Sequence, residues 1–312
     1  MKILIIGGAG FIGSNLVKFL IKKEHEVYAV DNLVTGNKKN IETLLNNNLF
    51  HFIEKDIIDY DFADLPSFDL VYDLASPASP AVFASLSEEI LKVNSVGLLN
   101  VMNFFIKSKS KTFVFASTSE VYGDPKVDPQ PETYFGNVNS YGPRACYDEG
   151  KRFAEAVLYS YIQKYNVDVR IARIFNTYGP FMNPQDGRVI SNFINQAINN
   201  KPLTVYGDGA QTRSCCYVTD MVEGLYLLGT TQNIKGEVVN IGNPDERTIL
   251  EIAALIKKMT DSKSEVVYKD IGADDPKKRC PDVAKSKKIL NWEAKVDLEK
   301  GLQLTIEYFK NL

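Results

Sequence analysis

The chain has 312 residues, of which 45% are hydrophobic and 24% are charged, and its formal net charge at pH 7 is −3. A chain of this length can bury a substantial core as one large domain or two medium ones. The small net charge gives no electrostatic reason to expect nucleic acid or an anionic membrane as the main partner. No apolar run approaches the roughly 20 residues of a membrane-spanning helix.

Cysteine and histidine are scarce. The cysteines are Cys146, Cys215, Cys216 and Cys280, and the histidines are His25 and His51. The cysteine spacing matches no zinc pattern, the adjacent pair is a poor candidate for a disulfide, and neither histidine adjoins a motif. We therefore expect reduced cysteines, a cytoplasmic location, no metal site and no Ser-His-Asp triad.

The first half of the chain alternates strand and helix patterns. Apolar runs bounded by polar segments predict strands at residues 3–6, 26–30, 50–54, 70–73, 112–116 and 169–174. Helical patterns fall at residues 11–22, at 89–107 and in a long segment that ends near Lys164. The apolar run at residues 1–6 is too short, and too quickly followed by glycines, for a signal peptide, and is expected to be a buried strand. This βαβ repetition predicts the α/β class, with a Rossmann-like, doubly wound parallel sheet.

The pattern changes after Asn176, where turns rich in glycine and proline interrupt it. Helices are predicted at residues 188–200, 219–229, 248–259 and 285–290, and strands at 203–206 and 237–241. The last of these strands could rejoin the sheet. The remainder is expected to form a smaller C-terminal lobe over the carboxyl edge of the sheet, where open α/β sheets bind ligands.

A glycine motif links the first strand to the first helix. Gly7, Gly10 and Gly13 allow a tight turn and a close backbone approach, and the helix N-terminus favours a pyrophosphate. Asp31 ends the second strand, where its carboxylate can accept from both ribose hydroxyls and would repel a 2′-phosphate. The motif predicts NAD rather than NADP, although Lys38-Lys39 could in principle hold that phosphate. The alternative is a turn that serves packing alone.

Polar residues also follow two later strands. Asp56 comes after the third strand, where it could contact the adenine amino group or merely cap a turn. Ser117-Thr118-Ser119-Glu120 follows the strand at 112–116 and places hydroxyls at the carboxyl end of the sheet. Taken alone, this segment would be a hydrogen-bonded turn that ends in a surface glutamate.

Tyr147 and Lys151 are four residues apart, so on a helix they share one face. A lysine ammonium close to a phenol favours the phenolate, which makes the tyrosine a usable base. Taken alone, this could be a solvated pair. Together with the glycine motif and a hydroxyl near Thr118, it predicts oxidation of a carbinol by a nicotinamide cofactor.

Nearly the whole chain resembles the UDP-glucuronate decarboxylases, also called UDP-xylose synthases, within the extended short-chain dehydrogenase/reductase superfamily. The blocks that carry the resemblance are residues 74–80, 117–125, 142–152, 170–180, 186–189, 207–209, 211–214 and 274–282. The chain departs from the family at Phe181, where arginine is usual, and at Ser140-Tyr141, where Pro-Ile is usual. Both departures lie near motifs that shape the pocket or a dimer contact.

The resemblance implies roles for individual residues. Tyr147 would be the base, and Lys151 would lower its pKa and hold the nicotinamide ribose. The implied catalytic residues are Thr118, Ser119, Glu120, Tyr147, Lys151 and Arg279. The implied cofactor-binding residues are Gly7, Gly10, Phe11, Ile12, Gly13, Asp31, Asn32, Thr35, Asp56, Ile57, Leu74, Ser76, Tyr147, Lys151, Thr177 and Arg188. The implied substrate-binding residues are Lys92, Asn176, Val189, Tyr206, Arg213 and Arg279.

The implied reaction turns UDP-glucuronate into UDP-xylose by transient oxidation at sugar carbon 4, loss of carbon dioxide and re-reduction, with NAD retained. Three alternatives remain: release of the 4-keto-pentose, 4-epimerisation of a nucleotide sugar, and a non-catalytic dinucleotide sensor. The resemblance further implies an NAD-binding domain at 1–178 with 214–241 rejoining it, and a nucleotide-sugar-binding lobe at 179–213 and 242–312. It also implies a homodimer.

Overall fold

The central feature of the computed structural model, which describes residues 1–272 and 274–312, is a seven-stranded parallel sheet. Its strands, in the order β11-β6-β5-β4-β1-β2-β3, are β11 (Val238–Ile241), β6 (Asp168–Ile174), β5 (Thr112–Thr118), β4 (Leu70–Asp73), β1 (Lys2–Ile6), β2 (Glu26–Asp31) and β3 (Phe50–Glu54). The chain leaves β1 toward β2 and β3, then returns to β4 on the other side of β1. This reversal of direction creates the crevice at which doubly wound sheets bind ligands. The predicted fold class is therefore confirmed.

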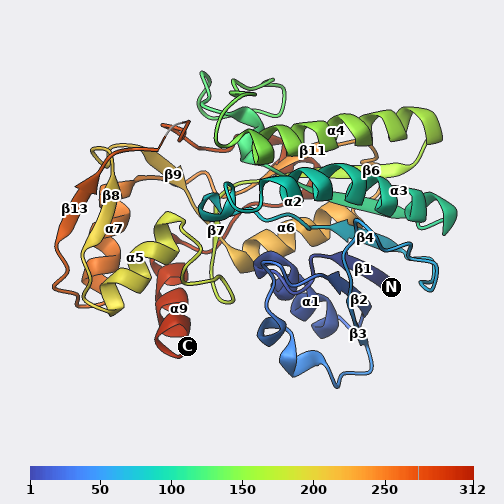
Figure 1. The fold of residues 1–312 in the computed structure, drawn as a ribbon, viewed down its shortest axis with the longest axis horizontal. Helices are drawn as coiled ribbons and strands as arrows, with labels where there is room; N and C mark the ends of the chain where they lie inside the picture. Colours follow the sequence, from blue (N-terminus) through green and yellow to red (C-terminus); the bar gives the residue numbers. More distant parts are fainter. Residues whose placement is uncertain (273) are drawn as a thin grey trace.

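Helices cover both faces of the sheet (Figure 1). On one face α1 (Phe11–Lys22) and α6 (Val218–Thr230) pack against alternate residues of the strands, such as Ile3 and Ile5. On the other face α3 (Leu98–Lys107) and α4 (Ala145–Tyr165) cover the intervening residues. Burial on both faces explains why these strands are almost continuously apolar in the sequence.

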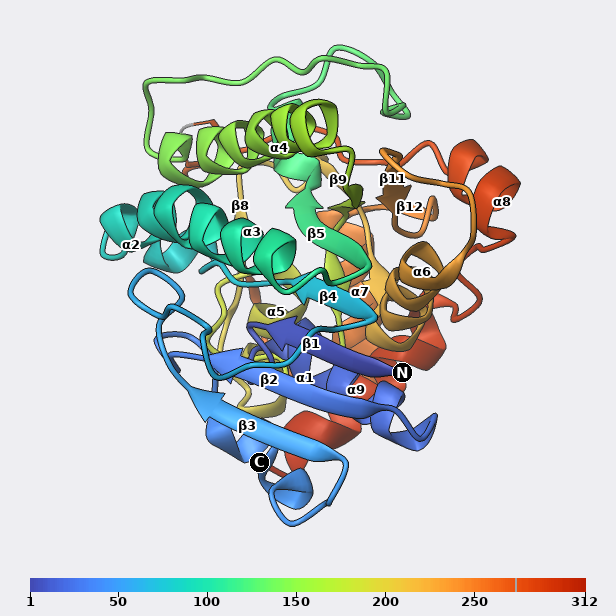
Figure 2. The ribbon, with the colours of Figure 1, turned by 90° about the vertical axis from the view of Figure 1, so that its right-hand side faces the viewer.

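The helix predicted at 89–107 consists of two parts. Helix α2 (Ser87–Lys92) continues through a π-helical turn (Val93–Gly97) into α3. Figure 2, turned by 90°, shows α2, α3 and α4 as one layer above the sheet.

The C-terminal lobe has its own hydrophobic cluster. Its helices are α5 (Val189–Ile198), α7 (Ile249–Met259) and α9 (Leu298–Lys310). Its strands form two short sheets, β8 (Leu203–Tyr206) with β13 (Val266–Lys269) and β9 (Thr212–Ser214) with β12 (Glu246–Thr248). Two further contacts tie the lobe to the sheet domain. Strand β10 (Cys216–Tyr217), which pairs with β7 (Thr177–Tyr178), lies against both α6 and α9, and α8 (Ala284–Leu290) packs on β11.

Candidate active site

A cleft of about 1190 Å³ runs along the carboxyl ends of the strands and reaches the C-terminal lobe. Of the residues singled out from the sequence, those in the cleft wall are Gly7, Gly10, Phe11, Ile12, Gly13, Asp31, Asn32, Thr35, Asp56, Ile57, Leu74, Ser76, Thr118, Ser119, Glu120, Tyr147, Lys151, Asn176, Thr177, Arg188, Val189, Tyr206 and Arg213. Lys92 and Arg279 are absent from the wall formed by the described residues. The fold thus gathers most of the predicted site from segments far apart in the sequence.

The glycine motif forms a tight cradle between β1 and α1. Gly7 has φ +79°, a conformation that side chains disfavour, and its carbonyl accepts from Gly10 N at 3.2 Å. A Cβ atom at Gly13 would lie 2.0 Å from the Gly7 carbonyl oxygen. The absence of side chains therefore lets the helix N-terminus approach the strand end, which is the geometry that a dinucleotide pyrophosphate requires.

Asp31 and Asp56 line the cofactor end of the cleft. Asp31 is buried and accepts from Ala9 N at 2.9 Å and from Leu33 N at 2.8 Å. Burial raises the pKa of its carboxyl, and these backbone N–H groups oppose the rise. Asp56 accepts from Ile58 N at 2.9 Å, so of its two predicted roles the turn cap is present in the structure.

Helix α4 places Tyr147 and Lys151 in the cleft wall. The ring of Tyr147 stacks on Phe83, with 5.1 Å between centroids. The Lys151 ammonium donates to the carbonyl of Ala116 at 2.9 Å. Burial lowers the pKa of Lys151 to about 8 and raises that of Tyr147 to about 12.

Two polar side chains in the cleft lower the pKa of Tyr147 against the effect of burial. Thr118, through its hydroxyl, and then Arg188 act against the effect of burial on the Tyr147 phenol. The Lys151 ammonium is bound to the backbone carbonyl of Ala116 in β5, and its expected effect on the Tyr147 pKa stays a prediction. The hydroxyl at the last residue of β5, Thr118, is therefore the main group that opposes the effect of burial on the Tyr147 pKa.

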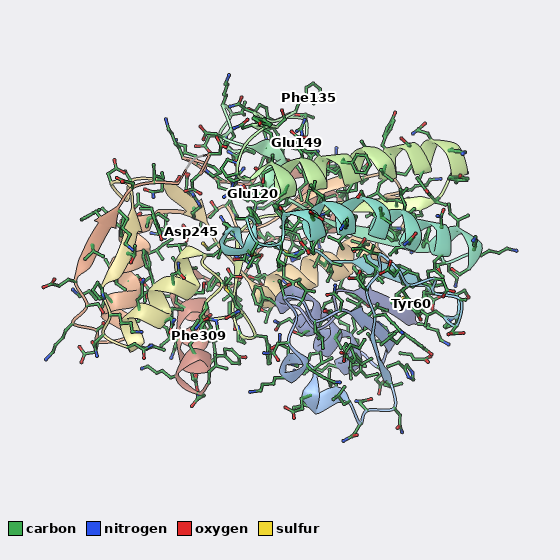
Figure 3. All side chains as sticks on the ribbon, viewed as in Figure 1. Tyr60, Glu120, Phe135, Glu149, Asp245 and Phe309 are labelled. Atoms are coloured by element: carbon green, nitrogen blue, oxygen red, sulfur yellow. The ribbon has the colours of Figure 1, made fainter. Side chains whose placement is uncertain are left out.

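Glu120 lies where the sheet domain meets the C-terminal lobe (Figure 3). Its Oε2 accepts from Arg144 Nη2 at 2.6 Å and from Arg279 Nη2 at 3.0 Å. Burial alone would raise the pKa of Glu120, but Arg279 and then Arg144 outweigh it and hold the pKa below its ordinary value. Arg279 is only 1% exposed and also donates to the carbonyl of Ser119 at 2.7 Å, so it supports the wall from behind.

Sequence reasoning assigned no role to Arg144 or to two acids close to it. Arg144 Nε lies 3.8 Å from Asp148 Oδ2, and Arg144 Nη1 lies 3.9 Å from Asp275 Oδ1. Burial raises the pKa of Asp148 to about 7, with a further contribution from Glu120. The sequence offered one indication that Arg144 lies near the site, which is its position three residues before Tyr147.

The predicted substrate-binding residues differ in whether they line the cleft. Arg213 donates to Asp275 at 2.9 Å, and Tyr206 at the end of β8 is 46% exposed. Lys92 is bound to Glu88 at 3.1 Å on the exposed side of α2. The structure therefore does not bring Lys92 together with the rest of the site.

Two of the predicted cofactor-binding residues form hydrogen bonds with residues two positions earlier in the sequence. Arg188, at the start of α5, donates to Asp186 with Nη2 at 2.8 Å. The Thr177 hydroxyl donates to the carbonyl of Phe175 at 2.9 Å.

Phe181, the first departure from the family pattern, lines the cleft and contacts two elements. The Lys18 ammonium of α1 lies 3.1 Å from its ring centroid, and the Tyr308 ring of α9 lies 5.2 Å away. Phe181 therefore joins the sheet domain to the C-terminal lobe. At the second departure, Ser140-Tyr141, the tyrosine is 96% exposed.

Residues 3–242 match the NAD dependent epimerase/dehydratase family. The chain belongs to this family. Within it, UDP-glucuronic acid decarboxylase 1 of Danio rerio is 49% identical over 308 residues, which are 99% of this chain and 72% of that relative. UDP-glucuronic acid decarboxylase 3 of Arabidopsis thaliana is 46% identical over 311 residues, 99% of this chain and 89% of that relative.

Solved structures of the family have the same fold. UDP-glucose 4-epimerase from Thermotoga maritima, with UDP-glucose, is 33% identical at a TM-score of 0.91, covering 100% of this chain and 99% of its own. UDP-glucuronic acid 4-epimerase from Bacillus cereus, in complex with UDP-glucuronic acid and NAD, is 29% identical at a TM-score of 0.90, with the same coverage. The predicted family and the predicted cofactor, NAD, are confirmed.

Proposed function

We propose that this protein converts UDP-glucuronate into UDP-xylose and carbon dioxide, by oxidation at sugar carbon 4, decarboxylation and re-reduction. The observation that carries the proposal is the presence, in one cleft, of Tyr147 with Thr118, the glycine cradle, and a glutamate held between two arginines. The similarity to UDP-glucuronic acid decarboxylases over nearly the whole chain supports it.

The residues present fit NAD, because Gly7, Gly10 and Gly13 have no side chains to obstruct a pyrophosphate and Asp31 lines the same end of the cleft as an acceptor for a ribose. When bound, NAD supplies the hydride acceptor for the oxidation and the hydride donor for the return step. Tyr147 takes the proton of the sugar 4-hydroxyl and later gives it back. Thr118 binds the same hydroxyl and favours the phenolate, because it opposes the effect of burial on the pKa of Tyr147.

Oxidation at carbon 4 makes the carboxylate on carbon 5 part of a β-keto acid. The bond between carbons 5 and 6 then breaks, its electron pair remains on carbon 5 as an enolate, and carbon dioxide leaves. Ser119 and Glu120 act in this step and in the protonation of carbon 5, because they line the cleft together with Tyr147. Arg279 acts through them, since it is buried behind the wall and donates to both residues. A low-dielectric wall with fixed charges is suited to stabilising such an anion.

Asn176 and Arg213 would hold the UDP diphosphate, with Val189 and Tyr206 near the uridine. Val189, Tyr206 and Arg213 belong to the segment 179–213 of the C-terminal lobe, and Asn176 lies at the end of the first segment of the sheet domain. This placement supports separate binding regions for the cofactor and the nucleotide sugar. Residues 1–178, with 214–241, would bind NAD, and residues 179–213 and 242–312 would bind the nucleotide sugar.

The test follows carbon dioxide, NADH and the nucleotide sugar together after UDP-glucuronate and NAD are mixed with the purified protein. UDP-xylose without net NADH supports the proposal. Carbon dioxide with stoichiometric NADH would assign the protein to the 4-keto-pentose-forming decarboxylases. Retention of carbon 6 with inversion at carbon 4 would make it an epimerase, in line with the solved epimerases that share its fold. Bound NAD without any reaction would indicate a sensor.

We also propose a homodimer, supported by apolar side chains on the outer side of α2, the π-helical turn and α4. Leu91 and Val96 are nearly half exposed, and Phe153 is 50% exposed. Phe153→Glu should give a monomer in light scattering, whereas Tyr268→Glu, at an exposed aromatic residue on β13, should leave the dimer intact. Monomeric wild-type protein would contradict this proposal.

We also propose a cytoplasmic location, because all four cysteines are free thiols. Within residues 1–272 and 274–312, no helix has both the length and the apolarity that crossing a membrane requires. Cell fractionation tests the location, and recovery of the protein from an oxidising compartment would contradict it.

A further inference from the structure

We propose that Arg144 is a positioning residue for the decarboxylation step, which holds Glu120 in the cleft wall and fixes its place relative to Tyr147. The inference deepens the proposed function and rests on it. Arg144 differs from Arg279 in one decisive respect. Its side chain lines the cleft, whereas Arg279 is buried behind the wall.

The bond between Arg144 and Glu120 is the first observation. Arg144 Nη2 donates to Glu120 Oε2 at 2.6 Å, and the two side chains are only 12% and 16% exposed. A charge-assisted hydrogen bond of this length, shielded from water, fixes direction as well as charge. Arg279 binds the same oxygen at 3.0 Å from the other side, so Oε2 is held between two guanidinium groups.

The aromatic stack at the start of α4 is the second observation. The Phe83 ring stacks on Tyr147 at 5.1 Å, and the guanidinium carbon of Arg144 lies 5.6 Å from the same ring. Arg144 thus contacts both the spacer ring beside the base and the carboxylate of Glu120. A displacement of Arg144 would change the separation of the two functional groups even if the backbone stayed in place.

The charges around Glu120 explain why a neutral substitute cannot replace Arg144. The titratable and charged groups that face Glu120 are Arg144, Tyr147 and Asp148 from α4, Arg188 at the start of α5, Arg213 from β9, and Arg279 from the segment after β13. Two of the cations that would remain without Arg144 are already paired with other carboxylates. Arg213 is bound to Asp275, and Arg188 is bound to Asp186. Glu120 would then ionise less readily and would be free to turn.

The experiment is a single turnover of NAD-loaded enzyme with UDP-glucuronate, in which NADH absorbance reports the oxidation and trapped carbon dioxide reports the cleavage. Arg144→Met should leave NADH formation close to wild type and slow carbon dioxide release about tenfold or more. NADH should therefore accumulate. Arg144→Lys keeps the charge but loses the planar guanidinium, so its rate of carbon dioxide release should lie between those of wild type and Arg144→Met.

The pH profile separates positioning from a general loss of structure. The acid limb of carbon dioxide release should move about one pH unit higher in Arg144→Met and less in Arg144→Lys. Arg247→Met, at an arginine 48% exposed beside Asp245, is the matched control and should change neither rate nor profile.

Three results would overturn the inference. One is equal slowing of oxidation and cleavage in both Arg144 variants, and another is an unchanged acid limb. The third is a wild-type rate of carbon dioxide release in Arg144→Met. Failure of the proposed function is distinguishable in the wild-type enzyme, which would then either release no carbon dioxide or release it with stoichiometric NADH and without UDP-xylose.

Discussion

Gly13 is the residue at which the cofactor cradle can be tested most directly. A methyl group at this position would lie 2.0 Å from the carbonyl oxygen of Gly7, 2.9 Å from its carbonyl carbon and 3.0 Å from the Cα of Gly8. All three atoms belong to the backbone, so no flexible side chain can move aside. Gly13→Ala must push the loop away from α1, and it should therefore damage both packing and the pyrophosphate site.

The size of the Tm change expected for Gly13→Ala follows from two opposing effects on the free energy of unfolding. Forcing a methylene-sized group into a packed region costs about 1–3 kcal/mol, while alanine in a helix gains about 0.5–1 kcal/mol over glycine. An unfolding entropy of about 2.1 cal/mol/K per residue makes each kcal/mol worth about 1.5 °C in Tm for a chain of 312 residues. Gly13→Ala should thus lower Tm by up to about 4 °C without NAD.

The assay is thermal unfolding with and without NAD. Wild-type Tm should rise with NAD concentration, since a ligand that binds only the folded state stabilises it. The Tm of Gly13→Ala should respond weakly or not at all. Gly150→Ala in α4 is the matched control, because its nearest new contact, at Asn94, is an ordinary 3.6 Å. An unchanged Tm and a full NAD response in Gly13→Ala would refute the reasoning.

Four further variants test the site. Tyr147→Phe should bind NAD but form no NADH with UDP-glucuronate, and NADH formation at the wild-type rate would exclude it as the base. Arg279→Ala leaves Glu120 with one guanidinium fewer, and carbon dioxide release should fall far more than NAD binding; equal losses would contradict this. Asp148→Asn concerns pH: the folded pKa of about 7 exceeds the ordinary 3.8, so the stability that Asp148 contributes is present at low pH and is lost as pH rises through 7. The Tm of the variant relative to wild type should therefore rise between about pH 4 and 7 and level off above that, and a constant difference would contradict a raised pKa at this buried carboxyl. Lys18→Met removes a cation–π contact with Phe181, worth about 0.5–2 kcal/mol, together with a hydrogen bond to the carbonyl of Asn40. Tm should therefore fall by at least about 1–3 °C, and an unchanged Tm would show that neither contact contributes to stability.

The sheet domain was predictable because its signals are local. Buried parallel strands are apolar throughout, and the predicted strand at 70–73 and helix at 11–22 agree with β4 and α1 at both ends. The C-terminal lobe was predicted less completely. Strand β13 is half exposed along its length, and β9 and β12 have three residues each, so their pairing depends on contacts between distant segments.

The same contrast holds within the site. The glycine spacing and the interval between Tyr147 and Lys151 are visible in a short stretch of sequence, and the structure places both in the cleft. The burial of Arg279 was not visible, because it is created by a segment about 160 residues from its partners Ser119 and Glu120. Resemblance can assign a function to such a residue, but it gives no information on whether the side chain reaches the substrate.

The charge of the cleft illustrates why composition could not describe the site. A net charge of −3 gave no reason to expect nucleic acid or an anionic membrane and no sign of a basic site, yet Arg144, Arg188 and Arg213 line the cleft. Each is bound to a carboxylate of the chain, so the guanidinium groups are held in place before any ligand arrives. A dianionic diphosphate and a glucuronate carboxylate would then meet oriented donors rather than free positive charge, and orientation depends on pairs that only the folded chain brings together.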